Sequence, residues 1–240
     1  MNERSVGTLR RGEIIGGILY LPMYFYGSQV LAALIVYAAG WDLQSNQALA
    51  RINLVFGLIN LAVLGLIFFR YLRAQFRVFT QRGWQIFADT AVGLVVHYAL
   101  TYPASFLITL LSMLFGVDYA NANQEAVDAV VQTVPWMSVV IACLLAPPVE
   151  ELICRGLIFC GLRRRSRFWA YALSMTVFSA MHVYGSVSQQ SPAVSLMNLI
   201  VYLPAGWVLA RAYERSGTIW TSICLHSAIN LTALLLQALL

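Results

Sequence analysis

The chain has 240 residues, of which 60% are hydrophobic and only 10% are charged. A soluble domain of this length cannot bury so much apolar surface, so the composition excludes an ordinary soluble globular protein and indicates one polytopic membrane domain. The formal net charge of +5 does not indicate nucleic-acid binding, because the basic residues, all of them arginine, gather in a few loops between apolar runs.

Seven apolar runs follow one another along the chain, and each is long enough to cross a hydrocarbon core of about 30 Å as a helix. None shows the sustained alternation of a strand, so we predict an all-α membrane protein, a polytopic bundle of about seven transmembrane helices. The first run is too long for a signal peptide and is expected to remain as a membrane helix. The predicted spans are Ile14 to Tyr37, Ile52 to Phe69, Thr90 to Val117, Val134 to Leu162, Phe168 to Val187, Ala193 to Ala210 and Thr218 to Leu240.

Arginines occupy alternate loops between these spans. Under the positive-inside rule, this pattern predicts a cytoplasmic N-terminus and an external loop around Asp118, Glu125 and Asp128. Arg51 is expected to be the only loop arginine on the external side. The predicted cytoplasmic arginines are Arg4, Arg10, Arg11, Arg70, Arg73, Arg77, Arg82, Arg163, Arg164, Arg165, Arg167, Arg211 and Arg215.

The fourth predicted span contains two adjacent carboxylates, and ionisable side chains inside a membrane are rare and usually functional. Glu151 and Arg155 stand at i and i+4, in the order that favours an ion pair. Glu150 points about 100° away on a helix and has no local partner. Pro147 and Pro148 suit a helix N-terminus, where a carboxylate is stabilised. An alternative interpretation is that both glutamates only cap a helix and pair with Arg155.

Two further spans carry polar residues at a similar depth. His226 and Asn230 stand at i and i+4 on the last span and therefore share one face. At 1.5 Å per residue from the cytoplasmic arginines, Glu150, His182, His226 and Asn230 all lie roughly 16 to 22 Å into the membrane. We therefore expect the four to meet in an intramembrane catalytic cavity. His97, on the third span, is assigned to packing or to a hydrogen bond between helices.

This set of residues predicts peptide hydrolysis. Glu150 and His182 are suited to hold and deprotonate a water molecule, since a carboxylate and an imidazole are common general bases. His226 and Asn230 are suited to donate hydrogen bonds to the oxyanion of a tetrahedral intermediate. The sequence contains no serine elbow of the GxSxG type and no HExxH pair.

The same residues resemble the three signatures of the CAAX protease and bacteriocin-processing family, also called the Abi family of intramembrane proteases. The resemblance covers about the C-terminal 100 residues. It implies a glutamate-dependent endopeptidase in which the first glutamate and the first histidine activate water, the last two residues stabilise the oxyanion, and the second glutamate with the arginine is structural or orienting. The signatures are Glu-Glu-x-x-x-Arg at Glu150, Glu151 and Arg155, Phe-x-x-x-His at Phe178 and His182, and His-x-x-x-Asn at His226 and Asn230.

We therefore predict a single transmembrane domain, residues 1–240, with variable N-terminal helices in 1–130 and a catalytic core in 134–240. The expected partners are a peptide or membrane-protein substrate, prenylated or not, and the lipid bilayer. Nucleic acid is not expected, and the sequence specifies no oligomeric state. The size of the chain, the lack of a transit peptide and the family branch favour a bacterial plasma membrane.

No cofactor is expected, but zinc is an alternative, because Glu150, His182 and His226 also make a two-histidine, one-carboxylate metal site. Asn230 favours the metal-free mechanism, because an amide is a poor zinc ligand and a good oxyanion donor. Two other functions stay open on the sequence. One is a non-catalytic scaffold or immunity protein that binds a peptide in the same groove, and the other is a proton-relay transporter, against which no inverted repeat is seen.

Overall fold

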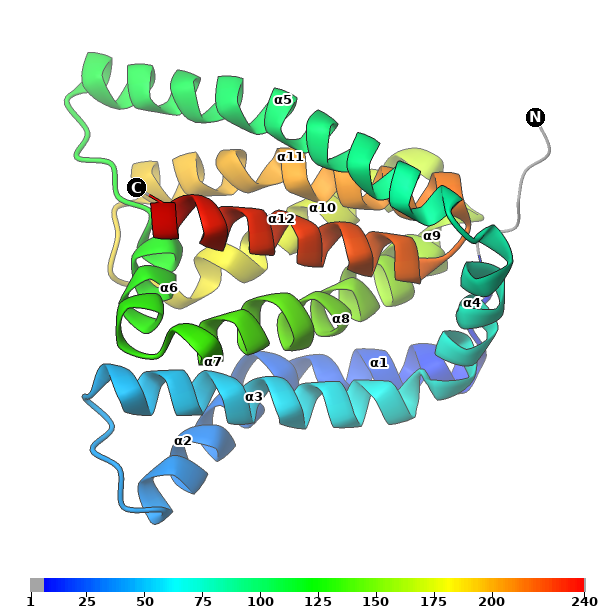
Figure 1. The fold of residues 1–240 in the computed structure, drawn as a ribbon, viewed down its shortest axis with the longest axis horizontal. Helices are drawn as coiled ribbons and strands as arrows, with labels where there is room; N and C mark the ends of the chain where they lie inside the picture. Colours follow the sequence, from blue (N-terminus) through cyan, green and yellow to red (C-terminus); the bar gives the residue numbers. More distant parts are fainter. Residues whose placement is uncertain (1–6, 240) are drawn as a thin grey trace.

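The computed structural model describes residues 7–239, so the predicted cytoplasmic Arg4 and the last residue of the seventh span lie outside it. All regular secondary structure within 7–239 is helical, which confirms the all-α prediction (Figure 1). η1 to η3 are π-helical turns and η4 is a 3₁₀ turn. In chain order the elements are α1 (Arg11–Pro22), η1 (Met23–Gly27), α2 (Ser28–Ala38), α3 (Asn46–Ile67), α4 (Phe69–Arg82), α5 (Gln85–Phe115), α6 (Ala122–Thr133), α7 (Pro135–Val139), η2 (Val140–Leu145), α8 (Ala146–Glu151), η3 (Leu152–Phe159), α9 (Cys160–Arg163), α10 (Arg167–Val183), η4 (Tyr184–Ser186), α11 (Pro192–Ser216) and α12 (Ile219–Leu239).

Within residues 7–239, six helical stretches are long and apolar enough to cross a membrane, and each corresponds to one of the predicted spans. The predicted fifth span, Phe168 to Val187, corresponds instead to α10, which has 17 residues and is shorter than the roughly 20 residues a spanning helix usually needs. α10 still runs along the bundle beside α11 (Figure 1). The six stretches are Arg11–Ala38, Asn46–Ile67, Gln85–Phe115, Pro135–Arg163, Pro192–Ser216 and Ile219–Leu239.

The start of α3 differs from the prediction, which placed Arg51 in an external loop. Ser45 caps α3, because its hydroxyl accepts a hydrogen bond from the Ala48 backbone N–H at 3.1 Å. The helix therefore begins before the apolar run, and Arg51 lies inside it. The Arg51 guanidinium stacks 3.4 Å from the centre of the Trp41 ring, so this charge is held by an aromatic side chain rather than exposed in a loop.

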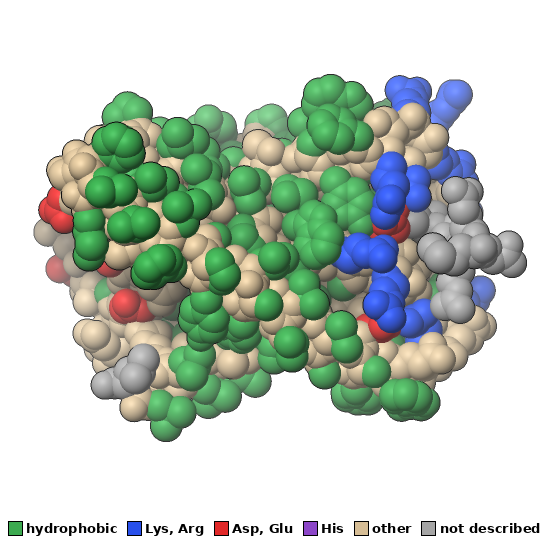
Figure 2. All heavy atoms as spheres, turned by 90° about the horizontal axis from the view of Figure 1, so that it is seen from above, with side chains coloured by type: hydrophobic (Ala, Val, Ile, Leu, Met, Phe, Trp, Pro, Cys, Tyr) green, Lys and Arg blue, Asp and Glu red, His purple; other side chains and the backbone are tan. Residues whose placement is uncertain are grey.

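Charge is divided between the two ends of the bundle. Figure 2 shows the arginines gathered at one end, here called the arginine face, and acidic side chains at the other. The acidic face is defined by Asp42, Asp118, Glu125 and Asp128, which lie in or beside the connections at the far ends of the long helices.

A carboxylate on α11 ties together the helix ends at the arginine face. Glu214 accepts hydrogen bonds from Arg163 at 2.6 Å, from Arg167 at 2.8 Å and from the Tyr171 hydroxyl at 2.7 Å. These donors come from α9 and α10, so one side chain fixes the ends of three helices. The Glu214 side chain is only 9% exposed, which protects these bonds from competing water.

Replacing Glu214 by glutamine is expected to lower the free energy of unfolding by about 1–2 kcal/mol, because charge-assisted hydrogen bonds become neutral ones. Thermal unfolding in detergent measures the change. Glu125→Gln, an exposed change on the acidic face, is the matched control and should unfold at the wild-type temperature. Equal unfolding temperatures for the two variants would contradict the structural role of Glu214.

One core joins the N-terminal and C-terminal halves of the chain. Phe68 and Tyr71 from the N-terminal half pack in the same buried cluster as Phe159 and Tyr213. The Tyr71 and Tyr213 hydroxyls form a hydrogen bond of 2.8 Å, which satisfies both polar groups inside the core. This layer fills the bundle on its arginine-face side.

Candidate active site

The helix that carries the two glutamates changes its winding around two prolines. The run Pro135–Arg163 is a single continuous helical stretch, so Pro147 and Pro148 do not begin a separate helix as the sequence suggested. In the π pattern of η2, a carbonyl accepts from the residue five positions later. For Ala142 and Cys143 those residues are Pro147 and Pro148, which have no N–H. The two carbonyls are therefore left without a backbone donor.

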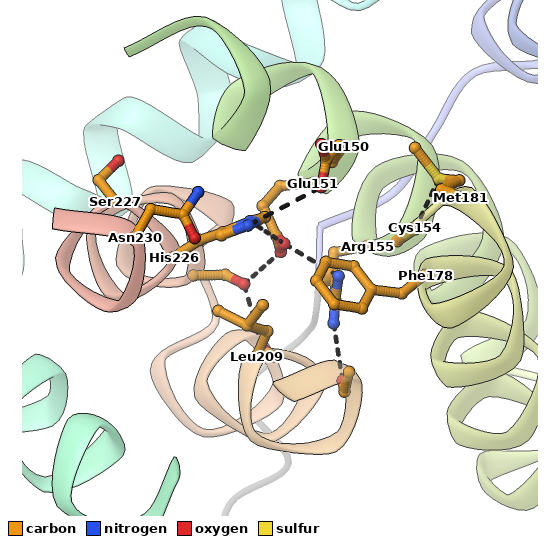
Figure 3. Close-up of polar contacts among 12 residues, drawn as sticks. Glu150, Glu151, Cys154, Arg155, Phe178, Met181, Leu209, His226, Ser227 and Asn230 are labelled. Carbon is orange, nitrogen blue, oxygen red and sulfur yellow. Dashed lines mark hydrogen bonds and ion pairs between the residues drawn. The ribbon is translucent and has the colours of Figure 1, made fainter. Parts of the chain in front are cut away.

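α12 supplies the missing donors. The Asn230 side-chain amide donates to the Ala142 carbonyl at 2.7 Å, and the Ser227 hydroxyl donates to the Cys143 carbonyl at 2.8 Å. In an apolar environment a buried carbonyl without a partner is costly, so these bonds define how α12 sits against η2. The same register directs His226 towards the glutamates (Figure 3).

Glu151 is a completely buried carboxylate with three side-chain donors around it. Its Oε1 accepts from Arg155 Nη1 at 2.9 Å and from His226 Nδ1 at 3.1 Å, and its Oε2 accepts from the Ser222 hydroxyl. Arg155 is also completely buried and donates through Nη2 to the Gly206 carbonyl at 2.7 Å. The structure thus brings Glu151 and Arg155 together as a bonded pair, as the i and i+4 spacing predicted (Figure 3).

The hydrogen-bond partners of the two histidines determine which ring nitrogens carry protons. An ionised carboxylate and a carbonyl can only accept hydrogen bonds. His226 therefore donates through Nδ1 to Glu151, and His182 donates through Nδ1 to the Phe178 carbonyl at 2.9 Å. In both neutral rings, Nε2 is then left with a lone pair.

Both of these Nε2 atoms face the remaining glutamate. Glu150 Oε2 lies 3.7 Å from His182 Nε2 and 3.8 Å from His226 Nε2. These separations are too long for direct hydrogen bonds and short enough for a bridging water molecule. Glu150 Oε2 is buried and has no hydrogen-bond partner among the described residues. A carboxylate oxygen of this kind, between two imidazoles, is suited to accept a proton from a water molecule.

The His182 ring also packs against two aromatic side chains. The Phe178 ring centre lies 4.6 Å away and the Tyr202 ring centre 4.5 Å away. Phe178 contacts the Arg155 guanidinium as well, at 4.9 Å. These contacts restrict rotation of the imidazole and hold its Nε2 towards Glu150.

The four predicted catalytic residues line one cavity of about 910 Å³. Glu150 comes from α8, His182 from α10, and His226 and Asn230 from α12, so three helices converge on the same space. Asn230 is already bonded through one amide hydrogen to a backbone carbonyl, which leaves its second N–H for a ligand.

Comparison with known proteins gives a family match over this part of the chain. Residues 132–232 match the family model described as type II CAAX prenyl endopeptidase Rce1-like. The chain carries a domain of this family. It is also similar to the candidate membrane peptidase YdiL of Bacillus subtilis (strain 168), with 27% identity over 157 residues, which is 61% of this chain and 58% of that relative. The chain thus spans less than two thirds of the length of that relative. No solved structure matches the chain significantly.

Within the CAAX endopeptidase domain, two residues of the site were not assigned from the sequence. Ser222 bonds to Glu151, and its position four residues before His226 was a signal that both share one face of α12. Tyr202 offers no signal in the sequence beyond its polarity, and its ring contact with His182 depends on how α11 packs against α10. His97, outside the family match, also lines the cavity and bonds to Thr101 at 3.3 Å.

The zinc alternative required Glu150, His182 and His226 to form a ligand set. Among residues 7–239, no group of three or more histidine, cysteine, aspartate or glutamate side chains is arranged to hold a metal ion.

Proposed function

We propose that the chain is an intramembrane endopeptidase that hydrolyses a peptide bond of a membrane-associated substrate, prenylated or not, with a water molecule activated by Glu150 and His182. The observation that carries this proposal is the approach of two imidazole Nε2 atoms, at 3.7 and 3.8 Å, to a carboxylate oxygen that has no hydrogen-bond partner among the described residues. The family domain supports it, because its members are described as endopeptidases.

The first step is the activation of water. A water molecule between Glu150 Oε2 and His182 Nε2 donates one hydrogen bond to each, which leaves an oxygen lone pair directed away from both acceptors. As this oxygen attacks the substrate carbonyl, Glu150 takes its proton. The tetrahedral intermediate then carries one negative charge on the former carbonyl oxygen.

The second step is stabilisation of that charge and release of the amine. Asn230 donates its free N–H. His226 donates through Nε2 in molecules that enter the cycle with both ring nitrogens protonated, so this proton is neither gained nor lost during the cycle. When the intermediate collapses, the C–N bond breaks and Glu150 returns its proton to the leaving nitrogen, so the enzyme ends in its starting state.

The buried pair below the site has an orienting role in this proposal. Glu151 bonds to His226 while Arg155 neutralises its charge, so the imidazole is held without leaving an uncompensated carboxylate in the bundle. The arrangement follows a general rule for reactive histidines, in which the second nitrogen is held by a carboxylate or carbonyl.

We further propose that α10 completes seven crossings and that the arginine face lies in the cytoplasm of a bacterial cell, with the protein in the plasma membrane. The arginines gather at one end (Figure 2), which supports this orientation because loops rich in arginine are retained on the cytoplasmic side. α10 starts with Arg167 at that face and reaches η4 towards the acidic face, in the direction a crossing requires.

Tyr202 is expected to position His182. Tyr202→Leu removes the ring that contacts the imidazole and should lower kcat about tenfold with little change in KM, because small misplacements of a general base are costly. Tyr202→Phe retains the ring and should restore most of kcat. Steady-state kinetics of peptide cleavage compare the three proteins, and an equal loss of kcat in both variants would contradict a positioning role for the ring.

The proposed function is tested with purified protein and a quenched peptide library. Wild type is expected to cut some members of the library, and Glu150→Ala and His182→Ala are each expected to lose that activity while remaining folded. Each protein is assayed with and without a metal chelator. Loss of wild-type activity on chelation, with recovery on adding zinc, would replace the glutamate mechanism by a metal mechanism. Peptide cleavage that is retained in Glu150→Ala would contradict both the glutamate mechanism and the metal mechanism.

A further inference from the structure

The catalytic cavity extends from the Glu150 layer in one direction only. On the arginine-face side, the space is filled by completely buried side chains such as Arg155, Phe159 and Tyr213. In the other direction, the cavity is lined by the acidic-face ends of α3 and α12, by the N-terminal turns of α6, and by the segment after α10. Figure 1 places α6 at the end of the bundle opposite α4. A ligand can therefore reach Glu150 from the acidic face and not from the arginine face.

This outer arm of the cavity is rich in neutral side-chain amides. They come from five separate segments that meet only in the folded chain. Among the described residues that line the cavity, Glu150 is the only aspartate, glutamate or arginine. Gln237 Oε1 is buried there without a hydrogen-bond partner among the described residues. The amides of the outer arm are Gln29, Asn53, Asn121, Asn123, Gln124, Gln189 and Gln237.

The chemistry of this lining selects among ligands. Side-chain amides both donate and accept hydrogen bonds, as the backbone of an extended peptide does. A lipid chain in the same place would leave the buried Gln237 Oε1 without a hydrogen-bond partner, which is unfavourable. A charged side chain would be buried without an opposite charge, which is also unfavourable. The lining therefore fits a stretch of uncharged polypeptide.

The depth of the arm indicates how long that stretch is. His226 and Gln237 lie on the same helix, α12, at the two ends of the arm. Eleven residues of helix correspond to about 16 Å at 1.5 Å per residue. An extended chain covers roughly 3.3 Å per residue, so about five substrate residues fit between the outer opening and the catalytic layer.

We propose that the outer arm binds about five uncharged, extended residues of the substrate, which reach Glu150 from the acidic face. The substrate class is thus a peptide segment presented on the side of the membrane away from the arginine loops. This inference rests on the proposed function for the identity of the cleaved bond, but the direction of access does not depend on cleavage.

Sided thiol labelling tests the direction of access. Asn53→Cys, inside the arm, and Arg165→Cys, a reference on the arginine face, are reconstituted separately in sealed vesicles and treated with a membrane-impermeant maleimide from each side. Wild type, with its four cysteines, provides the background. Asn53→Cys is expected to react with maleimide added on one side of the membrane only, and Arg165→Cys with maleimide added on the opposite side. Reaction from the same side as Arg165→Cys, or from neither side, would overturn the proposal.

Cleavage in detergent tests the chemistry of the arm. A peptide that wild type cuts is altered by placing a single aspartate or lysine at each of the five positions on either side of the cut. On one side of the cut, each such substitution should lower kcat/KM by about tenfold or more. Asn53→Leu should raise KM, whereas Gln47→Leu, on the exposed surface of the same helix, should not. Equal cleavage of charged and neutral peptides would overturn the proposal. Cleavage that is retained in Glu150→Ala would instead contradict the proposed function, and the direction of access would still be decided by the labelling experiment.

Discussion

Glu150→Gln is expected to lower kcat for peptide cleavage by about 10³-fold, because it removes the general base and keeps the shape of the side chain. Glu150 makes no hydrogen bond through Oε2 to any described residue, and its nearest imidazole nitrogens lie beyond direct bonding distance. The change should therefore abolish activity without removing a contact that holds the bundle together.

Two measurements separate these effects. Steady-state kinetics report the loss of kcat, and thermal unfolding in detergent should give a midpoint equal to or above that of wild type, since the variant no longer buries a carboxylate between two histidines. Glu125→Gln, the same chemical change on the acidic face, is the control and should retain full activity. A Glu150→Gln protein with activity within tenfold of wild type would remove Glu150 from the catalytic step.

Arg155→Ala is expected to destabilise the protein by about 3–5 kcal/mol, because it leaves the fully buried Glu151 carboxylate without its counter-charge. It also leaves the Gly206 carbonyl without its donor. Asn230→Ala removes one hydrogen bond to a carbonyl and should cost only about 1 kcal/mol. The loss of stability in each variant thus distinguishes Arg155, which has a structural role, from Asn230, which is assigned to the oxyanion.

Denaturant or thermal unfolding in the same detergent compares these variants with wild type. The double variant Glu151→Gln with Arg155→Met should recover part of the stability lost in Arg155→Ala, because no isolated charge remains buried. If Arg155→Ala and Asn230→Ala unfold at the same temperature, or if the double variant is no better than the single one, the buried pair does not have the structural role assigned to it.

The sequence predicted the helical class and the approximate positions of the spans, because apolar length is a strong signal in a membrane protein. The predictions from the sequence were wrong at helix ends, where a capping side chain or a turn decides where the helix begins or stops. A capping hydroxyl at Ser45 starts α3 before the apolar run, so Arg51 is helical. α10 is shorter than its apolar run suggested, because the chain leaves the helix at Val183 and turns through η4.

For the candidate site, spacing along a helix was informative and packing between helices was not. The Glu151–Arg155 contact follows from an i and i+4 spacing, whereas the contacts of Glu151 with Ser222 and His226 join residues 71 and 75 positions apart. The depth argument brought the four candidate residues to one layer, but it gave no orientation of the rings. The catalytic roles of these residues remain predictions that the experiments above decide.

The paired prolines of the glutamate helix have a consequence for exchanging parts between related proteins. The carbonyls of Ala142 and Cys143 have their donors on α12, from Asn230 and Ser227. A chimera that took either helix alone from a relative without this match would leave two carbonyls, or two donors, without partners inside the bundle. A functional chimera is therefore expected to need both helices from the same parent.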